Sequence, residues 1–317
     1  MTEKLPVLLI AFNRFEYTEE VISVLFKFQP SKLYLAMDAP KSKEDHAIQN
    51  RIIKLASDSL GDSRLHLIRG ESNRGTGVFI PDAITKFFEF EEFGIILEDD
   101  CVPTLTFFEY CRQLNSQYEN IPQVMAICGS NLIAEGEKGD AYRLGPFFVP
   151  WGWATWRDKW TKFDRIEANL NQIEKEIDRN WYSSSTLRNY MAKYIENATK
   201  PESRVWTGFW LCSMIRADGV IATPDTNLVT NIGFQGHGMN ANIKLQSIFT
   251  RESFEINEPI FHESSESDLL VLENKYFEIL NSASGETSKN FLGTAIKLLQ
   301  RLKGTMLPGR SEVTRPQ

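Results

Sequence analysis

The sequence predicts an α/β protein in which a mostly parallel sheet carries helices on both faces. In the first third of the chain, short apolar runs typical of strands alternate with amphipathic runs typical of helices. This order favours a parallel sheet, because each helix returns the chain to the edge where the next strand begins. Polar residues follow the four strands, namely Asn13 and Arg14, Asp38, Asn73 and Arg74, and Asp99 and Asp100. Ligands bind beyond the carboxyl ends of such strands, so a site is expected there.

The strands of this first third are expected at residues 6–12, 32–37, 64–69 and 95–97. Three helices between them are indicated by apolar residues at helical spacing: Val21, Ile22, Leu25 and Phe26 in 18–28; Ile48, Ile52 and Ile53 in the second; Ile80, Ile84, Phe87 and Phe88 in the third. Ser42 and Asp45 have the spacing of a capping box at the start of the second helix. The Gly-rich segment 73–77 predicts a loop before the third.

The rest of the chain has a mixed pattern. A helix is expected at 105–118, strands at 124–128 and 219–222, and a helical stretch at 166–194 interrupted by Ser183–Ser185. Residues 147–160 are dense in aromatic side chains. From residue 282 a Ser/Gly/Thr linker leads into a basic, amphipathic segment. We therefore expect one domain over 1–281, with a nucleotide-binding half at about 1–101 and an acceptor half at about 102–281, followed by a tail over 282–317.

Composition narrows the function classes. The chain has 317 residues, of which 42% are hydrophobic and 24% charged, as in soluble globular proteins. A net charge of −7 argues against a general nucleic-acid binder, and no apolar stretch approaches the length of a membrane span. The first strand is followed by Asn13 and Arg14 without a cleavage pattern, so we expect no signal peptide. The four cysteines form no C-x-x-C pair, which fits reduced thiols in a cytoplasmic protein.

The apolar strand 95–97 ends in three adjacent acids, Glu98, Asp99 and Asp100. Carboxylates this close repel one another and are costly to bury, so they require a positive partner. A divalent cation is the commonest such partner, because Mg²⁺ and Mn²⁺ are bound by one or two carboxylates beside substrate phosphates. A solvated turn after a core strand is an equal alternative on these residues alone.

Several segments together resemble the GT-A fold nucleotide-sugar glycosyltransferases, in particular N-acetylglucosaminyltransferase I and related bacterial enzymes. They are PVLLIAFNR (6–14), NRGTG (73–77), IILEDDCVPTLTFFEY (95–110), FFVPWGWATWRDKW (147–160) and NLVTNIGFQGHG (227–238). The resemblance implies an α/β fold of the GT-A type with a Rossmann-like sheet, flanking helices and an acceptor-side extension. It also implies that Mn²⁺ or Mg²⁺ is bound by Asp100, with Asp99 on the ribose, on the sugar or on the metal through water. Glu98 would hold a neighbouring group in place.

The same resemblance places further residues around the donor. Ala11, Phe12 and Arg14 are expected near the base and ribose, and Asp38 as an acceptor from the base. An Asx turn before Pro40 is the rival role for Asp38. Arg74 has the chemistry to bind a diphosphate, and an exposed loop arginine is its alternative.

Three further positions complete the expected donor site. Gly152 and Trp153 are expected near the sugar, whereas Trp156 and Trp160 are expected to pack. His237 lies between two glycines and is expected to ligate the metal or donate to phosphate. His262 has weaker support.

The catalytic base is the point at which the chain departs from the family. Inverting relatives carry an acid near Trp206, where this chain has Thr207, a residue with no useful basicity at neutral pH. Glu202, Asp158 and Asp225 are the candidate bases, with Glu202 preferred. Inversion is expected from the resemblance alone.

The sequence thus predicts a cytoplasmic, metal-dependent glycosyltransferase acting on a nucleotide-diphosphate sugar, with UDP the expected nucleotide. The acceptor would be a hydroxyl of a glycan or a lipid-linked glycan. The alternatives are a sugar nucleotidyltransferase, or a non-catalytic carbohydrate-binding protein that shares the fold. Residues 286–317 carry six positive and two negative side chains and an apolar face. Such a segment either lies on an anionic membrane surface or docks on its own domain, and both remain open.

Overall fold

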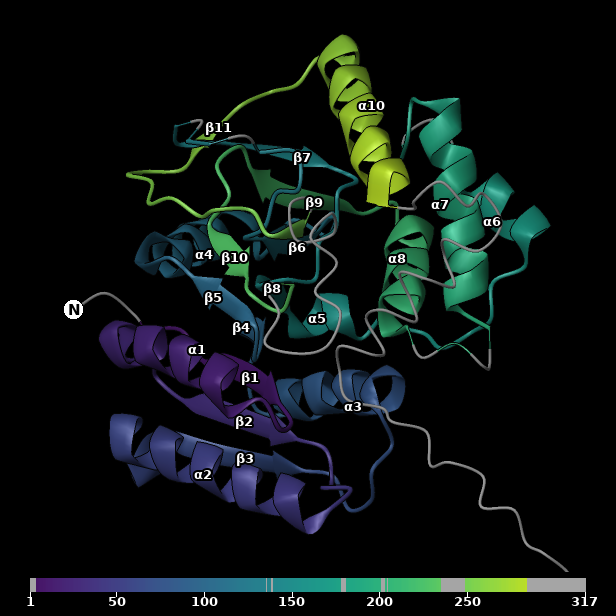
Figure 1. The fold of residues 1–317 in the computed structure, drawn as a ribbon. Helices are drawn as coiled ribbons and strands as arrows, with labels where there is room; N and C mark the ends of the chain where they lie inside the picture. Colours follow the sequence, from purple (N-terminus) through teal and green to yellow (C-terminus); the bar gives the residue numbers. More distant parts are fainter. Residues whose placement is uncertain are drawn as a thin grey trace, which may run out of the picture.

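A nine-stranded mixed sheet forms the centre of the molecule (Figure 1). The structure is a computed structural model that describes residues 4–134, 136–137, 139–177, 181–200, 203, 205–234 and 249–283. The strand order is β11-β7-β9-β6-β8-β4-β1-β2-β3. Its strands are β1 (Val7–Ala11), β2 (Leu33–Met37), β3 (Leu65–Arg69), β4 (Phe93–Glu98), β6 (Val124–Cys128), β7 (Ala141–Gly145), β8 (Trp153–Trp156), β9 (Val220–Pro224) and β11 (Ile260–Phe261).

The sheet is mostly parallel, as predicted. β1, β2, β3 and β4 pair in parallel, and β6 pairs in parallel with β9. β8 is the exception at the centre, because it runs antiparallel to both β4 and β6. Two reversals restore the direction, so β4, β6 and β9 point the same way. Their carboxyl ends therefore share one edge of the sheet with those of β1, β2 and β3.

Helices cover both faces of the sheet (Figure 1). One face is covered by α1 (Phe15–Phe28), α2 (Lys43–Leu60) and α4 (Leu105–Tyr118). The other face is covered by α3 (Thr76–Phe88), α5 (Arg157–Trp160), α6 (Leu170–Glu176), α7 (Ser185–Ala198), α8 (Trp206–Arg216) and α10 (Glu266–Ala283). Successive strand residues alternate between the two faces. In β1, Val7 and Leu9 join the core beneath the first group of helices, and Leu8 and Ile10 join the core beneath the second. The α/β fold class is thus confirmed.

Local sequence signals set several helix ends. Ser42 accepts a hydrogen bond from the backbone N–H of Asp45 at 3.0 Å, as the capping pattern predicted for α2. α3 begins after Gly75, whose φ of 75° is the left-handed conformation that glycine tolerates. The predicted helical stretch 166–194 is two helices, α6 and α7. Ser184 from the predicted break accepts from Leu187 N and caps α7.

A small two-stranded ribbon lies beside the main sheet. β5 (Cys101–Pro103) follows the three acids and pairs antiparallel with β10 (Val229–Asn231). The two strands pair although they are far apart in sequence, with Cys101 opposite Asn231. It brings the 227–234 segment to the carboxyl end of β4.

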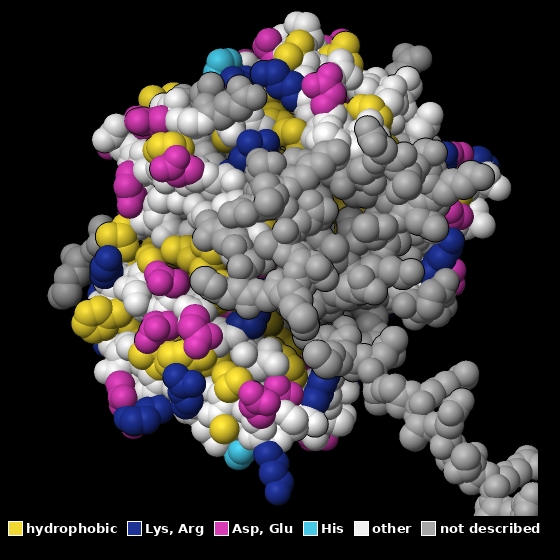
Figure 2. Space-filling view, in the orientation of Figure 1, with side chains coloured by type: hydrophobic (Ala, Val, Ile, Leu, Met, Phe, Trp, Pro, Cys, Tyr) yellow, Lys and Arg dark blue, Asp and Glu magenta, His cyan; other side chains and the backbone are white. Residues whose placement is uncertain are grey.

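The surface in the orientation of Figure 2 carries charges of both signs. Lys, Arg, Asp and Glu side chains are interspersed over the region of α1 and α2, at the lower left, and are not gathered into one basic face. Within the described ranges, no helix combines the length and apolarity that a membrane crossing requires. The tail over 286–317 lies outside the described residues, so its two predicted roles remain predictions.

The four cysteines are free and buried. Burial raises the pKa of Cys128 to about 12 and that of Cys212 to about 11, and it also raises the pKa values of Cys101 and Cys111. The thiolate is the reactive form, so the native protein is expected to resist a thiol-specific disulfide reagent at pH 8. All four thiols should react once guanidinium unfolds the chain. A thiol that reacts rapidly in the native protein would contradict this prediction, and peptide mapping would identify it.

Candidate functional site

The acids that end β4 meet an arginine that follows β1. The two strands are neighbours and parallel, with Ile10 in register with Glu98, so Arg14 and the acids leave the sheet side by side. Arg14 Nη1 lies 2.8 Å from Asp100 Oδ2, its Nη2 pairs with Asp99 Oδ1, and its Nε lies 3.3 Å from Asp99 Oδ2. The sequence predicted a positive partner for these acids, and the protein itself supplies one.

This cluster of Arg14, Asp99 and Asp100, here called the acid cluster, is almost completely shielded from water. Asp99 is 4% exposed and Asp100 is 7% exposed. Burial raises the pKa of Asp99; the charge of Arg14 opposes the rise, and repulsion from Asp100 adds to it. For Arg14, burial opposes the charged form, but the two carboxylates outweigh burial and raise the arginine pKa. Two acids therefore share one guanidinium, and the formal charges of the cluster sum to a negative value.

The segment after β10 closes tightly over the acid cluster. Ile232 donates its backbone N–H to the carbonyl of Asp100 at 2.8 Å, and Gly233 donates to Asn231 Oδ1 at 2.9 Å. A Cβ at Gly233 would lie 2.3 Å from Asp100 Oδ2, so any larger residue there would displace that carboxylate. The predicted ligand His237 follows four positions later, outside the described residues. Its role stays a prediction.

Asp38 organises the neighbouring strand end. Its Oδ2 accepts backbone N–H groups of Arg74 at 2.9 Å and Gly75 at 2.7 Å, and its Oδ1 accepts from Ala39 at 2.9 Å. Gly70 permits this packing, because a Cβ there would lie 2.6 Å from Asp38 Oδ1. Asp38 thus fixes the Gly-rich loop at the carboxyl edge, and its predicted contact with a nucleotide base remains a prediction.

The remaining predicted donor residues lie in different surroundings. Ala11 ends β1 and is buried, and the half-buried Phe12 follows it beneath Lys41, whose Nζ is 5.4 Å from the ring centre. The side chain of Arg74 is 42% exposed and pairs with Asp82 at 2.6 Å. Gly152 has a φ of 71° and lies against Val229 of β10, where a Cβ would be 2.7 Å from the valine side chain.

The tryptophans are core residues. Trp153 is 0% exposed, and its ring lies among Trp160, Trp206 and Trp210. A ligand cannot reach this ring without opening the core. The place of Trp153 near the sugar stays a prediction, in which its buried ring would not contact the sugar directly, whereas Trp156 and Trp160 pack as expected.

The candidate bases separate in space. Asp158 is exposed on α5, next to Arg157, whose backbone N–H bonds to Glu92 at the start of β4. The length of β4 then separates Asp158 from the acid cluster by about 20 Å at ~3.3 Å per residue. Asp158 is therefore at the wrong edge of the sheet for a base, and that expectation is corrected. The sequence did not reveal this, because it did not show that β8 runs antiparallel.

Asp225 lies at the correct edge, directly after β9. Its carboxylate forms a bidentate pair with Arg143, with Oδ1 2.8 Å from Nε and Oδ2 3.0 Å from Nη2. Glu202 lies outside the described residues. The sequence analysis did not predict Arg143, and nothing in its local pattern (AYRLG) marks it as a site residue.

The carboxylates of the acid cluster fit a divalent cation by their chemistry. Asp99 and Asp100 provide hard oxygen donors at the end of a buried strand. Over the described part of the chain, no group of three or more His, Cys, Asp or Glu side chains is assembled to hold a metal. Mg²⁺ and Mn²⁺ often use only one or two carboxylates and take further oxygens from water and substrate phosphates. The acid cluster suits that second kind of site.

Comparison with known proteins gives a fold likeness only. No protein-family model matches the sequence, and no curated protein matches it. Among solved structures, a UDP-glucose pyrophosphorylase complexed with UDP-glucose matches 86% of this chain and 99% of its own, with a TM-score of 0.39 and 8% identity. The glycosyltransferase GlyE from Streptococcus pneumoniae TIGR4 matches 69% of this chain and 45% of its own, with a TM-score of 0.33 and 14% identity.

A third solved structure is glucosyl-3-phosphoglycerate synthase from Mycobacterium tuberculosis in complex with Mn²⁺, uridine diphosphate and phosphoglyceric acid. It matches 49% of this chain and 56% of its own, with a TM-score of 0.30 and 10% identity. This chain thus spans about half the length of the last two enzymes. Because all three TM-scores are below 0.5, these similarities carry no argument about the activity of this protein.

Proposed function

We propose that this protein is a metal-dependent glycosyltransferase of the GT-A type. It would transfer a sugar from a nucleotide diphosphate, with UDP the expected nucleotide, to a hydroxyl of a glycan or lipid-linked glycan. The observation that carries the proposal is the acid cluster, in which two buried aspartates share one arginine at the carboxyl edge of a parallel sheet. Buried acids with an incomplete counter-charge suit a site that receives a cation and a diphosphate.

The residues of the cluster have separate roles in this proposal. Asp100, beside Gly233, would hold Mn²⁺ or Mg²⁺, and Asp99 would bind the ribose, the sugar or the metal through water. When bound, the cation would offset the negative charge that develops on the diphosphate leaving group. Arg14 offsets the repulsion between the two acids while no cation is bound, and its guanidinium would suit the phosphate oxygens when a diphosphate is bound.

The acceptor hydroxyl would be deprotonated by Glu202 or Asp225. Asp225 is the one for which the structure gives a position, at the same edge as the acid cluster. A base on the far side of the sugar from the leaving group leads to inversion, so an inverting reaction is part of the proposal. The anomeric configuration of the product, observed by NMR, tests it.

A thermal-shift panel of nucleotide sugars, each with and without Mn²⁺, tests the proposed function. One donor class is expected to raise the melting temperature in a Mn²⁺-dependent way, since a ligand at 100 times its Kd adds about 2.7 kcal/mol. Slow release of nucleoside diphosphate from that donor would show transferase chemistry. Formation of pyrophosphate from a nucleoside triphosphate and a sugar phosphate would indicate a nucleotidyltransferase. Binding without turnover would indicate a carbohydrate-binding protein, and no stabilisation by any donor would refute the proposal.

A further inference from the structure

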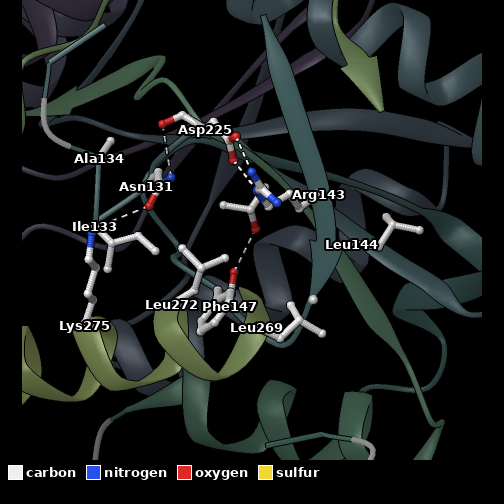
Figure 3. Close-up of a pocket in the computed structure, with 12 residues that line it drawn as sticks. Asn131, Ile133, Ala134, Arg143, Leu144, Phe147, Asp225, Leu269, Leu272 and Lys275 are labelled. Atoms are coloured by element: carbon white, nitrogen blue, oxygen red, sulfur yellow. Dashed lines mark hydrogen bonds and ion pairs between the residues drawn. The ribbon is translucent and has the colours of Figure 1, made fainter. Parts of the chain in front are cut away.

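A cavity lies away from the acid cluster, between the sheet and α10 (Figure 3). Its volume is about 290 Å³, at the small end of the range for ligand pockets. Residues from five places line it: the 131–134 loop, β7, Phe147 after β7, the end of β9 and α10. We call this cavity the α10 pocket.

One polar wall of the α10 pocket is an arginine–aspartate pair. Arg143 holds Asp225 in the bidentate geometry described above, and its Nη1 also donates to Ser264 Oγ at 2.9 Å. His262 Nδ1 lies 3.3 Å from Nη2 of the same arginine. A carboxylate has about four lone-pair positions, and these contacts use two of those on Asp225. The fixed carboxylate can therefore accept O–H groups from a ligand.

The opposite wall carries a cation. Lys275 extends from α10 toward Ile133, on the side of the pocket away from Arg143 (Figure 3). The described residues provide no ion-pair partner or hydrogen-bond acceptor for its ammonium group. Lys275, Arg143 and Asp225 together give the lining a formal charge of +1. A ligand with one negative group could pair with the ammonium group of Lys275 on this wall.

The position of Lys275 is set by the anchoring of its helix. Glu273 is 2% exposed, and its carboxylate accepts backbone N–H groups of Ser183 at 3.0 Å and Ser184 at 2.6 Å, at the start of α7. Tyr276 packs on Phe147, with the ring centres 5.2 Å apart. These contacts fix the rotation of α10, so that Leu269, Leu272 and Lys275, three residues apart, face the pocket.

The surface between the two polar walls is apolar. Leu269, Leu272 and Phe147 lie there (Figure 3), and they can cover the C–H face of a sugar ring. The pocket thus combines an acceptor of hydroxyl hydrogens, an apolar floor and a cation at the far rim. A neutral sugar would make no use of the exposed ammonium group of Lys275, and a simple lipid chain would make no use of either polar wall.

We propose that the α10 pocket binds an acidic saccharide unit, bearing a carboxylate or a phosphate, of the acceptor. This inference rests on the proposed glycosyltransferase function, because it identifies the acceptor of that reaction. Asp225 lies at the same edge as the acid cluster, and three strand spacings, about 14 Å in all, separate the ends of β9 and β4. That distance leaves room for the donor sugar between the two sites, with the acidic unit in the α10 pocket presenting its hydroxyl to Asp225.

Saturation-transfer NMR on the full chain, without nucleotide or metal, tests the proposal with glucuronate, glucose 6-phosphate and glucose as probes. At least one acidic probe is expected to bind roughly tenfold more tightly than glucose, the scale of a hydrogen bond to a charged group. Lys275→Gln should reduce the affinity for that probe to the affinity for glucose. Asp225→Asn should weaken all three, and Lys27→Gln on the distant helix α1 should change none.

The pattern among the probes identifies the acidic group. Preference for glucuronate alone indicates a carboxylate, preference for glucose 6-phosphate alone indicates a phosphate, and equal preference indicates recognition of charge. Equal binding of glucose, absence of binding, or an unchanged preference in Lys275→Gln would overturn the inference. The donor panel reports on the proposed function separately. Stabilisation by a nucleotide sugar without acidic-saccharide binding would refute the α10 pocket assignment and leave the glycosyltransferase proposal intact.

Discussion

Replacing Asp100 with asparagine is expected to abolish Mn²⁺-dependent donor binding and to lower turnover by at least roughly 10²-fold. The expected loss follows from the proposed role of the Asp100 carboxylate, because groups that stabilise developing charge typically contribute 10²–10³-fold each. The fold should persist, since Arg14 keeps its contacts with Asp99 and one source of repulsion is removed. Isothermal titration with the identified donor, with and without Mn²⁺, measures the effect.

A matched substitution shows whether the loss is specific. Asp58 is an exposed aspartate on α2 that pairs with Lys54 at 2.7 Å, far from the acid cluster along the sequence and on the outer surface. Asp58→Asn removes the same charge and should leave donor binding unchanged. Normal metal-dependent binding by Asp100→Asn would show that Asp100 is not the metal ligand.

Replacing Arg14 with methionine is expected to destabilise the protein by about 3 kcal/mol or more. Removal of one partner from a buried ion pair leaves the other charge uncompensated, which typically costs 3–5 kcal/mol. Here two carboxylates would lose their shared partner, and the side chain of Arg14 is only 16% exposed. Urea unfolding of the variant and the wild type measures the difference.

Mn²⁺ distinguishes a metal site from a purely structural ion pair in this variant. Without Arg14, the cation has no competitor for Asp99 and Asp100, so Mn²⁺ should stabilise Arg14→Met more than the wild type. Arg165→Met is the control, because Arg165 forms an exposed pair with Asp82 and such pairs contribute less than about 1 kcal/mol. If Mn²⁺ stabilises Arg14→Met no more than it stabilises Arg165→Met, or stabilises neither variant, the acid cluster does not hold the metal.

The first four strands were predictable because each is a short apolar run bounded by polar residues. Their helices were predictable from apolar spacing and from caps such as Ser42. Strands β5, β7, β8 and β11 were not predicted. β5 is only three residues long, and β8 is an aromatic run whose pairing partners are distant in sequence. Pairing over such distances depends on tertiary packing, which a local pattern does not encode.

The convergence of the polar strand ends was predictable, but their pairings were not. The polar ends of the parallel strands indicated one edge of the sheet, and the acid cluster and the Asp38 loop lie there. The sequence analysis placed Arg14 near the base and ribose, which stays a prediction, and it did not predict the ion pairs of Arg14 with Asp99 and Asp100. The α10 pocket could not be predicted, because Arg143, Asp225 and Lys275 lie on three separate elements with no shared motif.

The β5–β10 ribbon also determines when, during folding, the acid cluster is fully assembled. The N-terminal third contains Arg14, Asp99 and Asp100, but the wall that Gly233 forms against Asp100 comes from a segment synthesised much later. Contacts between residues so distant in sequence form late, because the intervening chain must first lose its freedom. A nascent chain can therefore build the parallel core early, while the acid cluster stays open to solvent until β10 docks. Protection of the Ile232 amide from hydrogen exchange would report the moment at which the site is complete.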